Sequence, residues 1–161
     1  MRQLLLALLA LAGPQAFAAE PDWIVHYTAK GKFEEVREDL VNAITERGLL
    51  LDHNSHVGQM LDRTGKDLGL TRKIFGPDQG QSFSFCSATL SRATMEADPF
   101  NIVFCPYTLT LYTTANEPGV VHLIYRRPIR PQSSAASVKT LKDVEELMDG
   151  IAREGMGLPK R

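Results

Sequence analysis

The sequence has no excess of charge of either sign. Its 161 residues contain 18 lysines and arginines against 19 aspartates and glutamates, for a formal net charge of −1. Such a balance offers no electrostatic footprint for nucleic acid. Apart from the short group Arg126, Arg127 and Arg130, the chain also lacks a polybasic cluster for a membrane surface. We therefore expect neither nucleic acid nor a charged membrane surface as a partner.

Several catalytic and cofactor motifs are absent as well. There is no Gly-x-Ser-x-Gly, so the usual serine hydrolase elbow is missing. The absence of Cys-x-x-Cys disfavours a thioredoxin-like redox pair, and the absence of Cys-x-x-Cys-His excludes covalent haem attachment. Residues 64–66 (Thr-Gly-Lys) lack the upstream glycine of a phosphate-binding loop. The sequence therefore names no reaction and does not favour an enzyme.

Long apolar runs are missing too, except close to the amino terminus. Arg2 precedes an apolar run over residues 4–12, and residues 16–18 (Ala-Phe-Ala) place small side chains where a signal peptidase cleaves. This run is shorter than the roughly 20 residues that a membrane span needs. We expect residues 1–18 to be a signal peptide, cleaved after Ala18, and the protein to be periplasmic or secreted without a membrane span.

The rest of the chain alternates strand and helix patterns. Strands are predicted at residues 23–31, 49–58, 81–86, 101–114 (interrupted by Pro106) and 120–128, the last two joined as a hairpin by a turn at 116–119. Helices are predicted at residues 32–48, 58–70 (short and broken at Gly65) and 87–99, with Ser87 as the N-cap of the last. We expect an α+β fold: a mixed sheet of about five strands with two to three packed helices.

Composition shifts after this domain. Residues 129–137 are rich in proline, serine and alanine and indicate a linker. Residues 138–161 form the C-terminal helix and tail, with apolar side chains at amphipathic spacing from Val138 to Ile151. The added helix either packs on its own sheet, which the pattern favours, or contacts a partner. The main α+β domain is then residues 19–128.

The two cysteines, Cys86 and Cys105, are the clearest candidate site. In an oxidising compartment an even number of cysteines is first interpreted as a disulfide. A bridge would close a loop of about 20 residues and stabilise the fold by about 3 kcal/mol. Cys86 ends one predicted strand and Cys105 lies inside the next, an order that can bring them side by side. A disulfide, a buried or metal-binding thiol pair, and two separate core cysteines all stay open.

His53 and His56 are the candidate nitrogen ligands. A strand over residues 52–56 would place the two imidazoles on opposite faces, so only a local turn or helix lets both reach one ion. His56 combined with either cysteine is the remaining mixed site, and imidazole with thiolate suits zinc, copper or haem iron. His26 and His122 lie on predicted strands and are interpreted as half-buried polar residues. The sequence names no metal and no cofactor.

The segment between the cysteines carries a family resemblance. Cys86, a helical stretch that ends at Asp98-Pro99, and a strand with Cys105-Pro106 resemble the family catalogued as domain of unknown function 302. The resemblance covers about residues 27–128 and omits the signal peptide and the C-terminal helix. It implies a compact α+β domain that forms homodimers, and no established reaction. Its transfer to this chain is limited to the two cysteines and the two prolines, the latter as structural residues.

Two classes of function follow. The favoured class is a non-enzymatic binding module for a small ligand, metal or tetrapyrrole near the cysteines, or a disulfide-stapled interaction domain. The alternative is a thiol-dependent enzyme or thiol carrier that uses Cys86 or Cys105, which requires a lowered thiol pKa. Cys86 directly precedes the predicted N-cap Ser87, where a helix N-terminus would lower that pKa.

Overall fold

The computed structural model describes residues 21–160, so the expected signal peptide lies outside the described residues. One sheet of five strands forms its centre, and the strands lie in the order β1-β5-β4-β3-β2. The strands are β1 (Ile24–Lys30), β2 (Leu51–His56), β3 (Gly80–Phe85), β4 (Tyr107–Tyr112) and β5 (Val120–Arg126). The predicted α+β class and the number of strands are confirmed.

The sheet is antiparallel throughout, and not mixed as the sequence suggested. Each of the four neighbouring strand pairs is antiparallel. The helix that follows β1 carries the chain across to the far edge of the sheet, where β2 pairs with β3 alone. The strands β1 and β2 point the same way, but they never become neighbours. The strand–helix–strand opening therefore contributes no parallel pair.

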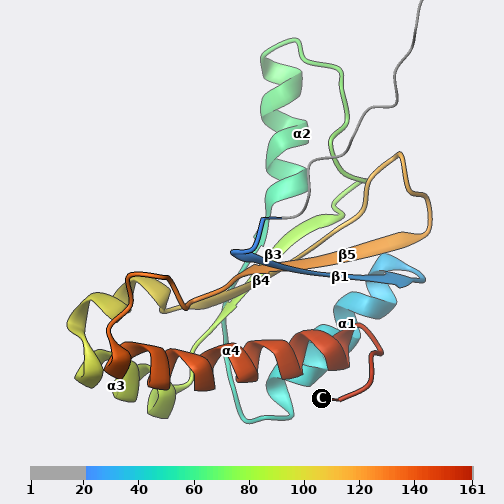
Figure 1. The fold of residues 1–161 in the computed structure, drawn as a ribbon. Helices are drawn as coiled ribbons and strands as arrows, with labels where there is room; N and C mark the ends of the chain where they lie inside the picture. The colour runs from blue at the N-terminus through green and yellow to red at the C-terminus, as the bar shows by residue number, and fades with distance from the viewer. Residues whose placement is uncertain (1–20, 161) are drawn as a thin grey trace, which may run out of the picture.

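The helices are α1 (Phe33–Thr45), α2 (Val57–Asp67), α3 (Ala88–Ala97) and α4 (Ala135–Gly155), together with the 3₁₀ helix η1 (Pro99–Phe104). Figure 1 shows α1, α3 and α4 on one side of the sheet, whereas α2 stands on the other side. No helix within residues 21–160 has the length and apolar character to cross a membrane. The predicted C-terminal helix is present as α4, and it packs against α1 and α3 of the same chain.

The hydrophobic core lies between the sheet and the helices α1 and α4. Helix α1 buries apolar residues at helical spacing, among them Leu40 and Ile44, which have no exposed surface. Helix α4 does the same with Leu141, Val144 and Ile151. The two helices approach very closely where α4 ends, because a Cβ atom added at Gly155 would lie 2.7 Å from the Cα atom of Leu40.

Local capping explains where elements differ from the sequence prediction. Residues 99–104 form η1 and not a strand, because the Asp98 carboxylate accepts a hydrogen bond from the Phe100 N–H (2.9 Å) and Pro99 occupies the first turn. Helix α4 begins inside the predicted linker, where the Ser134 hydroxyl accepts from the Ser137 N–H (3.2 Å). Helix α2 continues through Gly65 without a break. The hairpin of β4 and β5 is confirmed.

Candidate functional site

The two cysteines meet at one end of the sheet. Cys86 directly follows β3, and Cys105 is the C-cap of η1. Pro106, which is joined to Cys105 by a cis peptide bond, separates it from β4. Strands β3 and β4 pair with Phe85 opposite Tyr107, so the residues just beyond this pair are brought together. The Sγ atoms lie 2.8 Å apart, and both cysteines are half-buried and free in this structure. Cys105 therefore does not lie inside a strand, as the sequence suggested, but the proximity that was predicted is present.

Helix α3 forms one wall of this thiol pair. Its N-cap is Ser87, as predicted, whose hydroxyl accepts from the Leu90 N–H at 3.5 Å. The helix thus begins immediately after Cys86. One turn further, the Ser91 hydroxyl lies 3.4 Å from the Cys105 Sγ and 3.1 Å from the Tyr107 hydroxyl. The thiols are consequently part of a small polar network that joins α3 to the start of β4.

The thiol of Cys86 is a weak acid in this setting. Burial, followed by the hydrogen bond with Cys105 and the charge of that cysteine, raises its pKa to about 12. The backbone N–H of Tyr107 acts in the opposite direction but does not offset these effects. Burial also raises the pKa of the Tyr107 hydroxyl. At neutral pH the reduced Cys86 is therefore protonated, and it is a poor nucleophile.

Large apolar side chains are exposed on η1, the helix that directly precedes Cys105. Helix η1 exposes Phe100, Ile102 and Val103, whose exposed fractions are 86%, 62% and 75%. Leu50 is 82% exposed and directly precedes Leu51, which pairs with Phe85 next to Cys86. Exposed large apolar side chains that gather in one place are typical of interaction surfaces.

The structure does not bring His53 or His56 to the cysteines. His56 pairs with Gln81 at one end of β3, whereas Cys86 follows Phe85 at the other end. The Nδ1 atom of His56 lies 2.8 Å from the Asp78 carboxylate. His53 pairs with Ser84 on the same strand. Across residues 21–160, no group of three or more histidine, cysteine or acidic side chains is placed to hold a metal ion.

A histidine contact was missed by the sequence prediction. The Nε2 atom of His26 lies 3.0 Å from the Nδ1 atom of His122, and the His122 ring also stacks on Tyr112 with centroids 4.7 Å apart. The Nε2 atom of His122 lies 3.2 Å from a Glu117 carboxylate oxygen. Burial lowers the pKa of His122, although Glu117 acts against this shift. Only the pairing of β1 with β5 reveals this contact, and no local pattern signals it.

Comparison with solved structures identifies a similar fold. The crystal structure of the uncharacterized conserved protein DUF302 from Bacillus stearothermophilus matches this one with a TM-score of 0.67. The match covers 83% of this chain and 99% of that chain, at 16% sequence identity. No family model matches the sequence, and none of the curated proteins matches it. The likeness confirms the predicted fold, and the matching protein carries no assigned activity.

Proposed function

We propose that this protein is an exported, non-enzymatic interaction domain that is stapled by a disulfide between Cys86 and Cys105. The observation that carries the proposal is the 2.8 Å separation of their Sγ atoms. Thiols already in contact can bond without a rearrangement of β3 and β4. The signal-like residues 1–18 support an oxidising compartment, where such bonds form and persist.

Formation of the bond requires an electron acceptor, which we take to be a protein or small-molecule disulfide. The thiolate of one cysteine attacks the acceptor and displaces one of its sulfurs as a thiol, which leaves a mixed disulfide. The second cysteine then attacks the first and displaces the other acceptor sulfur. Two S–H bonds are lost and one S–S bond forms, while the acceptor gains two electrons and two protons. The product ties the end of β3 to the residues before β4.

The alternative, a thiol enzyme or thiol carrier, requires a thiolate at neutral pH. The pKa of Cys86, raised to about 12 by burial and by Cys105, acts against that role. A shared metal or haem site with His56 is also disfavoured, because His56 lies at the opposite end of β3. The geometry therefore supports the disulfide better than thiol chemistry or ligation.

The test is to count free thiols in protein purified from the periplasm or the culture medium. We expect none before reduction and two after reduction under denaturing conditions. The oxidised protein should be about 3 kcal/mol more stable than the reduced one, which corresponds to a Tm about 10 °C higher. The double variant Cys86→Ser/Cys105→Ser is the matched control, and its Tm should not respond to reductant.

Two results would contradict the proposal. The first is a pair of free thiols that stays unbonded when an excess of oxidised glutathione is added. The second is a thiol that reacts with an alkylating probe faster than glutathione does at neutral pH, which would favour the enzyme or carrier.

A homodimer, which the family resemblance implies, is part of the same proposal. The apolar side chains Phe100, Ile102 and Val103 support a contact with a second copy of the chain on η1. Light scattering over a range of protein concentrations tests it. We expect a dimer that the variant Phe100→Ser converts to a monomer, and a wild-type protein that is monomeric at every concentration would refute it.

A further inference from the structure

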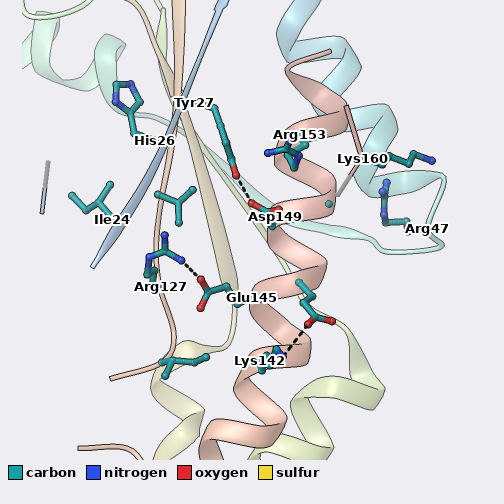
Figure 2. A pocket seen from close by; sticks show the side chains of 14 residues that line it. Ile24, His26, Tyr27, Arg47, Arg127, Lys142, Glu145, Asp149, Arg153 and Lys160 are labelled. Carbon is teal, nitrogen blue, oxygen red and sulfur yellow. Dashed lines mark hydrogen bonds and ion pairs between the residues drawn. The ribbon is translucent and has the colours of Figure 1, made fainter. Parts of the chain in front are cut away.

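A cleft lies between β1 and α4, and neither cysteine lines it. The cleft has a volume of about 890 Å³, which is in the range of small-molecule pockets. Figure 2 shows Tyr27 from β1 facing Asp149 and Arg153 from α4 across it, with Arg47 and Lys160 beyond the helix. Apolar side chains, including Ile24 and Ile129, form part of the lining. Neither the cysteines nor their neighbours take part.

The charges of the cleft are neutralised unevenly. At one end, Arg127 pairs with Glu145, and Lys142 lies 3.9 Å from Glu146. This end is therefore balanced, with two cations and two carboxylates.

The other end of the cleft has a surplus of positive charge. Arg47 pairs with Glu154 at 2.8 Å, and this hydrogen bond holds the pKa of Glu154 below its usual value. Arg153 and Lys160 form no direct ion pair with a carboxylate in the part of the chain that the structure describes. Among the residues that the structure describes, three cations at this end thus accompany two carboxylates, Glu154 and Asp149, for a net charge of about +1.

Arg153 is held in a fixed orientation. Its Nε–H donates to the carbonyl oxygen of Pro159 at 2.7 Å, and its guanidinium carbon lies 5.6 Å from the centre of the Tyr27 ring. These contacts leave the terminal N–H groups of the guanidinium available as a planar fork, the geometry that matches a carboxylate. A preoriented cation loses less side-chain entropy when it binds a ligand.

Asp149 determines where a negative charge can lie. Its Oδ1 atom accepts hydrogen bonds from the Tyr27 hydroxyl and, at 3.3 Å, from the Tyr125 hydroxyl. The carboxylate stays one helical turn from Arg153 and repels an anion at the centre of the cleft. An anionic group is therefore directed to the Arg153 and Lys160 end.

We propose that this cleft binds a small organic monocarboxylate. Its carboxylate would pair with Arg153, with the charge of Lys160 adding to the attraction at this end, and its apolar body would lie against the Tyr27 ring. The net charge of about +1 at this end matches one negative charge better than two. The site is independent of the thiol pair and adds a small-molecule ligand to the proposed interaction domain.

The test uses three probes of similar shape and different charge: benzoate, benzyl alcohol and benzylamine. Calorimetric or NMR titration of the purified protein should show binding of benzoate at about millimolar concentration. The neutral alcohol and the cationic amine should bind at least about tenfold more weakly. Shifted amide signals should map to β1 and α4, and benzoate binding should weaken as salt is added.

Three variants test whether these side chains bind the ligand, and a fourth variant is the control. Arg153→Gln should weaken benzoate binding about tenfold, and Lys160→Gln about threefold. Asp149→Asn should strengthen benzoate binding about threefold, because it removes a negative charge and keeps the side-chain oxygen that accepts from the Tyr27 and Tyr125 hydroxyls. Arg92→Gln, which removes an exposed cation on α3 paired with Glu96, is the matched control and should change nothing.

The proposal is overturned if benzoate binds no better than benzyl alcohol, or if Arg153→Gln and Arg92→Gln give the same affinity. It is also overturned if Asp149→Asn weakens binding instead of strengthening it. Should Arg153→Gln fail to fold, Lys160→Gln decides the question, because Lys160 lies on the exposed C-terminal tail and its replacement leaves the core intact.

Discussion

Replacement of Gly155 by alanine tests the contact between α1 and α4 directly. The added Cβ atom would lie 2.7 Å from the Leu40 Cα atom and 3.0 Å from its Cβ and Cδ1 atoms. The nearest of these atoms belongs to the backbone, and Leu40 has no exposed surface, so a side-chain rotation cannot relieve the clash. The two helices must separate locally.

The magnitude follows from two opposing effects. Overpacking of this kind costs about 1 to 3 kcal/mol. The better helix propensity of alanine would recover about 1 kcal/mol inside a helix, but less at Gly155, which is the last residue of α4. We expect a net loss of about 2 kcal/mol in the free energy of unfolding. For a domain of this size that corresponds to a fall of about 7 °C in Tm.

Gly150 on the same helix supplies the matched control. A Cβ atom there would meet only the Arg47 Nη2 atom, at 3.8 Å, which is an ordinary contact. Gly150→Ala should therefore raise stability by about 0.5 to 1 kcal/mol through helix propensity alone. Urea unfolding should move the midpoint in opposite directions for the two variants, with unchanged m-values. If Gly155→Ala is neutral or stabilising like Gly150→Ala, the close approach of the two helices is refuted.

Two further predictions concern buried polar residues. Burial lowers the pKa of His122, so the unfolded chain binds a proton there more readily than the folded one, and stability should be lost as the pH falls below about 6.5. In urea titrations at several pH values, His122→Asn should make stability depend less on pH. An unchanged pH dependence would contradict this prediction. The Asn101 amide donates to the Thr94 carbonyl oxygen at 2.8 Å and to the Ser137 hydroxyl at 3.0 Å. Asn101→Ala should therefore lower the free energy of unfolding by about 1 to 3 kcal/mol. Asn116→Ala, at an exposed position, should leave it almost unchanged. Equal Tm values for the two variants would contradict a stabilising role for the Asn101 hydrogen bonds.

The sequence predicted those elements whose signal is local. The spacing of Phe33, Val36 and Leu40 predicted α1, and the same periodicity predicted α4. Residues 102–104 are apolar and partly β-branched and favoured a strand, but the Asp98 cap and Pro99 produced η1 instead. The order of the strands depends on contacts between distant segments, which no window of sequence contains. The mixed sheet was wrong for that reason.

The thiol site was predicted in part for a similar reason. The proximity of Cys86 to Cys105 followed from the order of elements between them. The contacts of Ser91 with Cys105 and Tyr107 depend on the register of β3 and β4, so they were not visible. The cleft was missed as well, because its basic end combines Arg47, in the turn after α1, with Arg153 and Lys160 from the far end of the chain.

The pairing of β1 with β5 has a consequence for how this chain folds. The contact of His26 with His122 joins residues that are 96 positions apart, and β1 has no other neighbour in the sheet. A chain that emerges amino terminus first therefore cannot complete its sheet until β5 has emerged. Contacts of such long sequence separation slow folding, since loop closure must precede the contacts that stabilise it. The first strand therefore lacks its partner in the sheet until most of the chain has been synthesised.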